Sequence, residues 1–163
     1  MVSLDYEIVT LPSYRAIGMK WEGSYSEVSV LKEMIQCMCE RSRGLEYKLQ
    51  PQTQLGLSYH LRQDGFVHYS VFEVSGEEIV PEDMVEINIP SMSYLKVHHP
   101  KGEDIGATYS KIYQWMKENE MYTTDVEEGI TYFDDLPIKH ERYPLDRDLK
   151  APHFDILIPI KST

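Results

Sequence analysis

The residues with the clearest chemical potential are Glu141 and Tyr143, within the stretch 140–144. Alternate side chains of a strand share a face, so these two would point together and Arg142 away from them. If that face borders a cleft, a carboxylate stands among aromatic rings, and burial raises its pKa. A cationic guest relieves the burial penalty, and each ring adds roughly 0.5–2 kcal/mol of cation–π attraction. Glutamate is rarely buried, so spacing alone favours a solvated Glu141 paired with Arg142 or Lys139.

Aromatic side chains are abundant, with twelve tyrosines, four phenylalanines and two tryptophans in 163 residues. A tyrosine has an apolar ring and a hydroxyl that needs a partner when it is buried. The whole set therefore indicates polar sites within an apolar interior, although any single tyrosine could simply line a sheet face.

Charge and hydropathy argue against several classes of partner. Acidic residues outnumber basic ones by 27 to 16, and a net charge of -11 repels phosphate backbones, so we expect no direct binding of nucleic acid. No apolar run approaches the ~20 residues of a membrane span, and residues 1–10 lack a signal pattern, so we expect a cytoplasmic protein.

Motifs for cofactors and metals are missing from the sequence. All six histidines fall on predicted strands or loops, without the helical i, i+4 pair that often marks a metal site, so we expect no metal. No glycine-rich phosphate-binding pattern and no nucleophile elbow occurs, so we expect no cofactor and find no marked nucleophile.

Hydrophobic periodicity predicts an α+β chain. Alternation indicates strands at 4–10, 14–21, 53–61, 66–74, 85–89, 94–99, 140–143 and 154–160. A capping-box pattern, Ser24-x-x-Glu27, predicts a helix start, and a second helix follows Gly102. The buried stripes of the two helices are predicted to be Val28, Leu31, Met34, Ile35 and Met38, and Ile105, Tyr109, Ile112 and Met116.

The two halves of the sequence can be superimposed. Residues 7–13 match residues 86–91 with one residue dropped, and the offset that aligns Pro12 with Pro90 also places Leu31 on Tyr109. Such a constant offset is the mark of an internal duplication. We therefore expect one domain over 1–163 with repeats at about 4–75 and 84–161. The predicted fold is two β-α-β-β modules about a pseudo-twofold axis, forming an antiparallel sheet with two helices and a central ligand cleft.

A series of short motifs also runs in order along nearly the whole chain: Pro12…Ala16-Ile17-Gly18, Gly56-Leu57-Ser58-Tyr59, Ile89-Pro90…Tyr94-Leu95-Lys96-Val97, Tyr109…Ile112-Tyr113-Gln114-Trp115, Glu141-Arg142-Tyr143, and Asp155-Ile156-Leu157-Ile158-Pro159-Ile160-Lys161. Together they resemble the GyrI-like, or AraC-type effector-binding, domain family, which is related to the ligand-binding parts of multidrug-sensing regulators. The E-x-Y and the closing I-x-I-P-I-K are the most specific of them.

This resemblance implies a pocket between two modules, lined by aromatic rings around an acidic residue. Glu141 matches the acid and Tyr143 is its neighbour on the same face. The aromatic candidates for the lining are Trp21, Tyr59, Tyr94, Tyr113 and Trp115.

Three functions stay open at this point. The resemblance favours a binding protein for a lipophilic, cationic or aromatic effector; because no helix-turn-helix segment accompanies the domain, a DNA-binding regulator would be a separate chain. A second reading is a hydrolase of strained or electrophilic molecules, in which Glu141 acts as general acid or base. A third is a gyrase-inhibitor-like module whose acidic surface mimics nucleic acid. Turnover or its absence, and the response to Glu141→Gln, separate the three.

Overall fold

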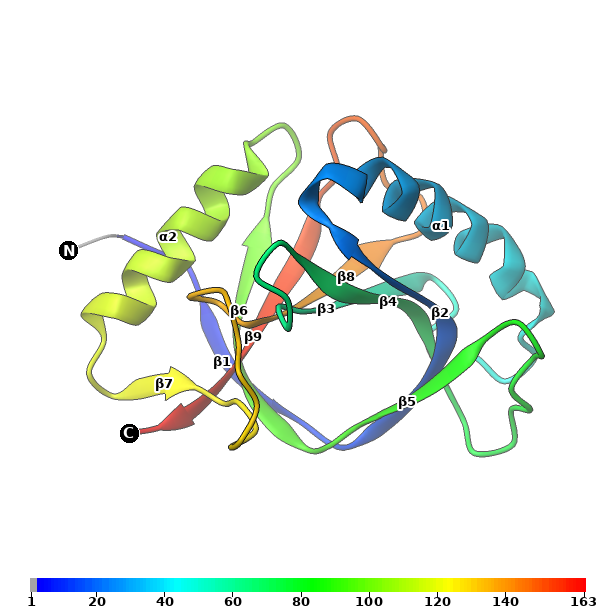
Figure 1. Cartoon of the computed structure of the whole chain (residues 1–163), viewed down its shortest axis with the longest axis horizontal. Helices are drawn as coiled ribbons and strands as arrows, with labels where there is room; N and C mark the ends of the chain where they lie inside the picture. Colours follow the sequence, from blue (N-terminus) through cyan, green and yellow to red (C-terminus); the bar gives the residue numbers. More distant parts are fainter. Residues whose placement is uncertain (1–2) are drawn as a thin grey trace.

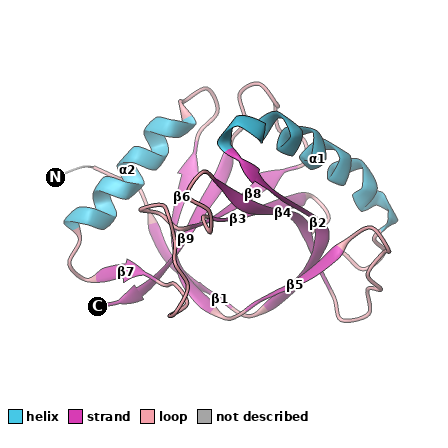
Figure 2. Cartoon of the chain, in the orientation of Figure 1, coloured by secondary structure: helices cyan, strands magenta, loops and turns pink. Residues whose placement is uncertain are grey.

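The computed structural model describes residues 3–163 (Figure 1). Its strands are β1 (Glu7–Leu11), β2 (Tyr14–Ser24), β3 (Thr53–Tyr59), β4 (Gly65–Val74), β5 (Val85–Ile89), β6 (Met92–His99), β7 (Tyr122–Thr124), β8 (Ile138–Pro144) and β9 (Phe154–Ser162). Its helices are α1 (Val28–Arg41) and α2 (Ile105–Glu118). Both helices lie on one side of a strongly curved sheet, whose edge strands β1 and β5 come round toward each other below it (Figure 2).

The nine strands form one antiparallel sheet with a symmetric order. Along the sheet the order is β1-β6-β9-β8-β3-β4-β2-β5, with β7 paired to β9. The counterparts in the two halves are β1 and β5, β2 and β6, β3 and β8, and β4 and β9. Exchanging the members of each pair gives the same strand order, read from the opposite edge of the sheet. The exchange axis falls between β3 and β8, where Gly56 pairs with Glu141. The predicted α+β fold with pseudo-twofold symmetry is confirmed, whereas the repeat boundaries 4–75 and 84–161 stay a prediction.

Both helices begin as the sequence indicates. The backbone N–H of Ser24 donates to Oε1 of Glu27 at 3.1 Å, completing the capping box at the 3-10 turn Tyr25–Glu27 that precedes α1. At α2, the backbone N–H of Ala107 donates to the carboxylate of Asp104 at 2.9 Å. Each bond satisfies a donor that the first helical turn leaves free.

The strands differ from the sequence pattern in several of their bounds and in one additional strand. The first strand begins at Glu7, where pairing with Lys96 of β6 starts, rather than at Leu4, which packs against the core beneath α2. The short strand β7 was not predicted; its three residues are too few to show alternation, and it exists through pairing of Tyr122 with Ser162 of β9.

Each helix covers a separate apolar core on the same face of the sheet. Ile112 and Trp115 of α2 pack against β6 and β9, and Met38 of α1 packs against Ile17 and Phe72 of β2 and β4. The strands between these cores, β3 and β8, lie at the centre of the sheet. Within residues 3–163, no helix is long and apolar enough to cross a membrane.

Candidate functional site

Polar and aromatic side chains fill the space between the two cores. We call this region the polar seam. It comprises the side chains of His68, His99, Tyr109, Glu141 and Tyr143 together with the backbone of Gly56. Strand alternation puts Glu141 and Tyr143 of β8 on the face that carries the helices, opposite Gly56 and Gln54 of β3. Tyr109 joins them from α2. The seam therefore receives side chains from both halves of the chain.

The carboxylate of Glu141 is held by two phenols. The hydroxyl of Tyr109 donates to Oε2 at 2.5 Å, and the hydroxyl of Tyr143 donates to Oε1 at 2.5 Å. Glu141 is half-buried as a residue, and desolvation raises the pKa of its carboxyl group although both hydrogen bonds act in the opposite direction. Desolvation and the neighbouring carboxylate raise the pKa of both phenols well above the usual value.

Two buried imidazoles of the seam have an unused nitrogen. Nδ1 of His68 is bonded to the hydroxyl of Ser58 at 2.8 Å, and Nδ1 of His99 to that of Thr108 at 2.8 Å. Neither Nε2 atom has a hydrogen-bond partner among the residues the structure describes. Desolvation lowers the pKa of His68 to about 4, so its ring is neutral at physiological pH. Buried polar atoms are normally paired, so these two nitrogens are available to a bound molecule or water.

Gly56 allows two rings of the seam to lie close together. A Cβ atom there would lie 3.1 Å from Cε1 of His68 and 3.3 Å from Cε2 of Tyr143, which is closer than most real Cβ contacts. The absent side chain therefore lets the imidazole and the phenol approach each other across β3 at the position that faces Glu141.

The chain's own cations lie over the two tyrosine rings. Nζ of Lys139 is 5.4 Å from the ring centre of Tyr109, and the guanidinium carbon of Arg147 is 4.7 Å from that of Tyr143. Both distances are within the range of cation–π attraction. The rings beside Glu141 are thus placed to interact with positive charge.

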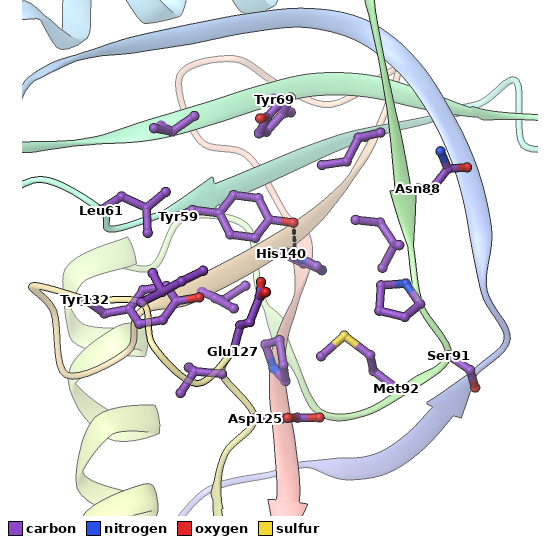
Figure 3. Close-up of a pocket in the computed structure, with 18 residues that line it drawn as sticks. Tyr59, Leu61, Tyr69, Asn88, Ser91, Met92, Asp125, Glu127, Tyr132 and His140 are labelled. Carbon is purple, nitrogen blue, oxygen red and sulfur yellow. Dashed lines mark hydrogen bonds between the residues drawn. The ribbon is translucent and has the colours of Figure 1, made fainter.

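The opposite face of the sheet contains a hollow of about 550 Å³. We call it the tyrosine hollow; Figure 3 shows Tyr59, Tyr69 and Tyr132 around it. The hydroxyl of Tyr59 is bonded to Nε2 of His140 at 3.2 Å inside it. His140 and Glu141 are neighbours on β8 and so face opposite sides, which separates this hollow from the polar seam. Glu141 does not line it.

The profile of the GyrI-like small-molecule-binding domain matches residues 4–161. The chain belongs to the GyrI-like family. A search of curated proteins finds no match.

Solved structures show where this GyrI-like fold recurs. The C-terminal domain of EcmrR is 13% identical, with a TM-score of 0.67 and 98% of each chain covered. In the EcmrR–DNA complex, this chain spans only 58% of the EcmrR chain, at 14% identity and a TM-score of 0.67. SAV2435 bound to tetraphenylphosphonium is 12% identical, with a TM-score of 0.68 and coverage of 97% and 94%. A hydrolase from Listeria innocua is 11% identical, with a TM-score of 0.56 and coverage of 98% and 93%. At these identities the likeness is one of fold.

The site residues predicted for the GyrI-like domain lie in different places. Glu141 and Tyr143 come together in the polar seam. Tyr59 lines the tyrosine hollow, and Tyr94 lies fully buried with its ring 5.7 Å from that of His140 and its hydroxyl unpaired within residues 3–163. The other three pack elsewhere on the helix side: Trp21 on Phe66, and Tyr113 and Trp115 in the core beneath α2.

Sequence reasoning included Tyr109 and Gly56 among the family motifs without assigning them to the site, and it considered His68 and His99 only as metal ligands. Tyr109 carried a signal, because a tyrosine on an otherwise apolar stripe must bring its hydroxyl to a partner. The two histidines gave none, since their role depends on neighbours 9 or 10 residues away and on strand pairing.

Proposed function

We propose that this GyrI-like domain binds a lipophilic cation in the polar seam, with Glu141 as its counter-charge. The observation that carries the proposal is the Glu141 carboxyl group, whose pKa is raised by desolvation while two tyrosine hydroxyls hold it in place. A buried carboxylate without a cation is destabilising, and a positively charged guest removes that penalty.

The surroundings support a cationic aromatic guest rather than a neutral one. Lys139 and Arg147 already lie over the rings of Tyr109 and Tyr143, so these rings accept positive charge. The unpaired Nε2 atoms of His68 and His99 can serve polar groups of the guest or a water that comes with it. The guest would take the place of one or both phenols beside the carboxylate.

The structural likeness to SAV2435 bound to tetraphenylphosphonium agrees with this ligand class. The likeness to EcmrR in a DNA complex agrees with an effector-sensing role. Both likenesses are of fold alone, and the likeness to SAV2435 is the reason for using tetraphenylphosphonium as the probe.

Calorimetric titration with tetraphenylphosphonium tests the proposal. Loss of a desolvated charge pair is worth about 2 kcal/mol or more, so we expect Glu141→Gln to weaken binding by about 30-fold. Glu120→Gln, an exposed glutamate outside the seam, is the matched control and should bind like the wild type. Triphenylphosphine oxide, an uncharged analogue, should bind weakly to both proteins. Equal affinity of the Glu141→Gln and wild-type proteins for the cation would refute the proposal.

One observation favours a second function, hydrolysis. A carboxyl group of raised pKa with two phenolic hydroxyls at 2.5 Å can act as a general base beside a general acid. On an epoxide, Glu141 would take a proton from water as the water oxygen bonds to carbon. The ring C–O bond would break and its oxygen would receive a proton from Tyr109 or Tyr143.

Styrene oxide is a suitable probe for this second function. Hydrolysis would give the diol, detected by mass spectrometry, at a rate that Glu141→Gln abolishes and Tyr109→Phe reduces. An unchanged epoxide with the wild-type protein would leave binding as the function of the seam.

A further inference from the structure

The tyrosine hollow is independent of the polar seam in position and chemistry. It lies on the face of the sheet away from both helices, bordered by β3, β4, β5, β8 and β9 and by the segment 125–132 (Figure 3). A volume of about 550 Å³ lies within the range of sites for drug-sized molecules. Residues of both halves of the chain line it, from Tyr59 in the first to Pro159 in the second.

The inner wall of the hollow is apolar and aromatic. Val67, Ile87 and Ile138 line it together with the rings of Tyr59 and Tyr69. The rings of Tyr59 and Tyr69 meet edge to face, with centroids 5.9 Å apart, which leaves ring surface for stacking.

The polar groups of the inner wall are uncharged. His140 is 4% exposed, and burial lowers its pKa to about 3, so its imidazole is neutral. Its Nε2 is occupied by the hydroxyl of Tyr59. Burial also raises the pKa of Tyr59 beyond its usual value, so the phenol stays protonated. An anionic or cationic group would find no opposite charge at this depth.

Charge is instead concentrated at the edge of the hollow. Of the eighteen described residues that line it, the charged ones are Asp125 and Glu127. Asp125 is half-buried and Glu127 exposed, and Figure 3 shows both side chains extending from the segment 125–132. The hollow therefore pairs an apolar interior with an anionic edge.

We propose that the tyrosine hollow is a second binding site, which takes an amphipathic amine with an aromatic body. The aromatic body would lie against Tyr59 and Tyr69, and the ammonium group at the end of a tether would lie beside Asp125 and Glu127. This geometry separates the apolar and charged ends of the ligand. A cation whose charge is at its centre, such as tetraphenylphosphonium, would place its charge in the apolar interior and is excluded.

The proposal stands whether or not Glu141 binds cations, because the two sites lie on opposite faces of β8. Chlorpromazine is the probe: it has a flat tricyclic body, a three-carbon tether and a tertiary amine that is protonated at neutral pH. Its affinity for the full chain can be measured by calorimetric titration at low salt.

Charge reversal at the edge provides the decisive variant. We expect Glu127→Lys to weaken chlorpromazine binding about tenfold, since an attraction becomes a repulsion. The neighbouring Glu128→Lys has the same change of net charge at an exposed residue that does not line the hollow, so its affinity should stay within twofold of the wild type. Both residues are exposed, so neither variant endangers folding.

Glu141→Gln separates this site from the polar seam. In this variant, which removes the counter-charge of the seam, chlorpromazine should still bind, Glu127→Lys should still weaken its binding about tenfold, and tetraphenylphosphonium should not displace the amine from the hollow. The proposal is overturned if chlorpromazine fails to bind, if Glu127→Lys and Glu128→Lys behave alike, or if Glu141→Gln removes its binding. Failure of tetraphenylphosphonium to bind would refute the cation site in the seam and leave this result unaffected.

Discussion

Replacing Glu141 by glutamine should stabilise the protein relative to the wild type, by an amount that grows with pH. Burial raises the pKa of this carboxyl group in the folded state, so the folded protein holds its proton over a pH range in which the unfolded chain has lost it. Glu141 therefore contributes stability that is fully present below its unfolded pKa of 4.5 and is lost as the pH rises through the folded pKa. Glutamine does not titrate.

The magnitude follows from the linkage between protonation and folding. Each unit by which the pKa is raised is worth about 1.4 kcal/mol once the pH exceeds the folded pKa. In a domain of this size 1 kcal/mol corresponds to roughly 3 °C, so each unit adds about 4 °C to the melting temperature of the variant relative to the wild type.

Thermal unfolding of both proteins at a series of pH values from 4 to 8 measures this difference. The two proteins differ at this one side chain, so the difference between their curves measures its contribution. Glu120→Gln, at an exposed position, should show no difference that depends on pH. The melting temperature of Glu141→Gln relative to the wild type could instead fall as the pH rises. The hydrogen bonds from Tyr109 and Tyr143 would then outweigh desolvation, and the destabilised carboxylate on which the proposed cation site depends would not exist.

Three further predictions concern folding. Gly18→Ala should destabilise the protein by about 3 kcal/mol or more in denaturant unfolding, because its Cβ would lie 2.0 Å from the backbone oxygen of Ser70; an unchanged midpoint would contradict this packing. Asp104→Ala should cost about 1 kcal/mol through loss of the cap to Ala107, and Asp104→Asn should recover most of it in the same assay. Burial lowers the pKa of His140 to about 3 in the folded protein, against 6.5 in the unfolded chain, so this residue contributes stability that is lost as the pH falls from about 6.5. His140→Gln should therefore reduce the loss of stability at acid pH. An unaltered loss would show that the ring is not buried in its neutral form.

Local patterns in the sequence predict most of the elements of this fold. The alternation at residues 53–61 and the helical stripes could be recognised because each strand or helix must bury one face. The capping box at Ser24 and Glu27 was recognisable because its two hydrogen bonds join residues three positions apart. The pairing of Glu141 with Tyr143 on one face also follows from alternation within a single strand.

The composition of the site depends on contacts that local patterns do not contain. Tyr109 meets Glu141 from 32 residues away, because α2 packs on β6 and β9 and β9 is the neighbour of β8 in the sheet. Tyr59 and Glu141 were predicted to share a pocket, yet they lie on opposite faces, since Tyr59 pairs with Ile138 and Gly56 pairs with Glu141 in the register of β3 and β8. Strand register therefore decides which aromatic rings surround the acid. The composition of the chain alone fixes neither that register nor the path of the helix.

The symmetry of the sheet explains why a polar seam is tolerated at its centre. Each helix closes an apolar core with the strands of its own half, and Met38 and Ile112 are fully buried without reaching the axis between β3 and β8. The strip along that axis holds a carboxylate of raised pKa, and the imidazoles of His68 and His99 there have Nε2 atoms without a hydrogen-bond partner among residues 3–163. A chain optimised for stability alone would place apolar residues there, because a buried ionisable group is replaced by a packed apolar one at little cost or with a gain. Polar groups kept at such a position, against the stability of the fold, are typical of a binding site.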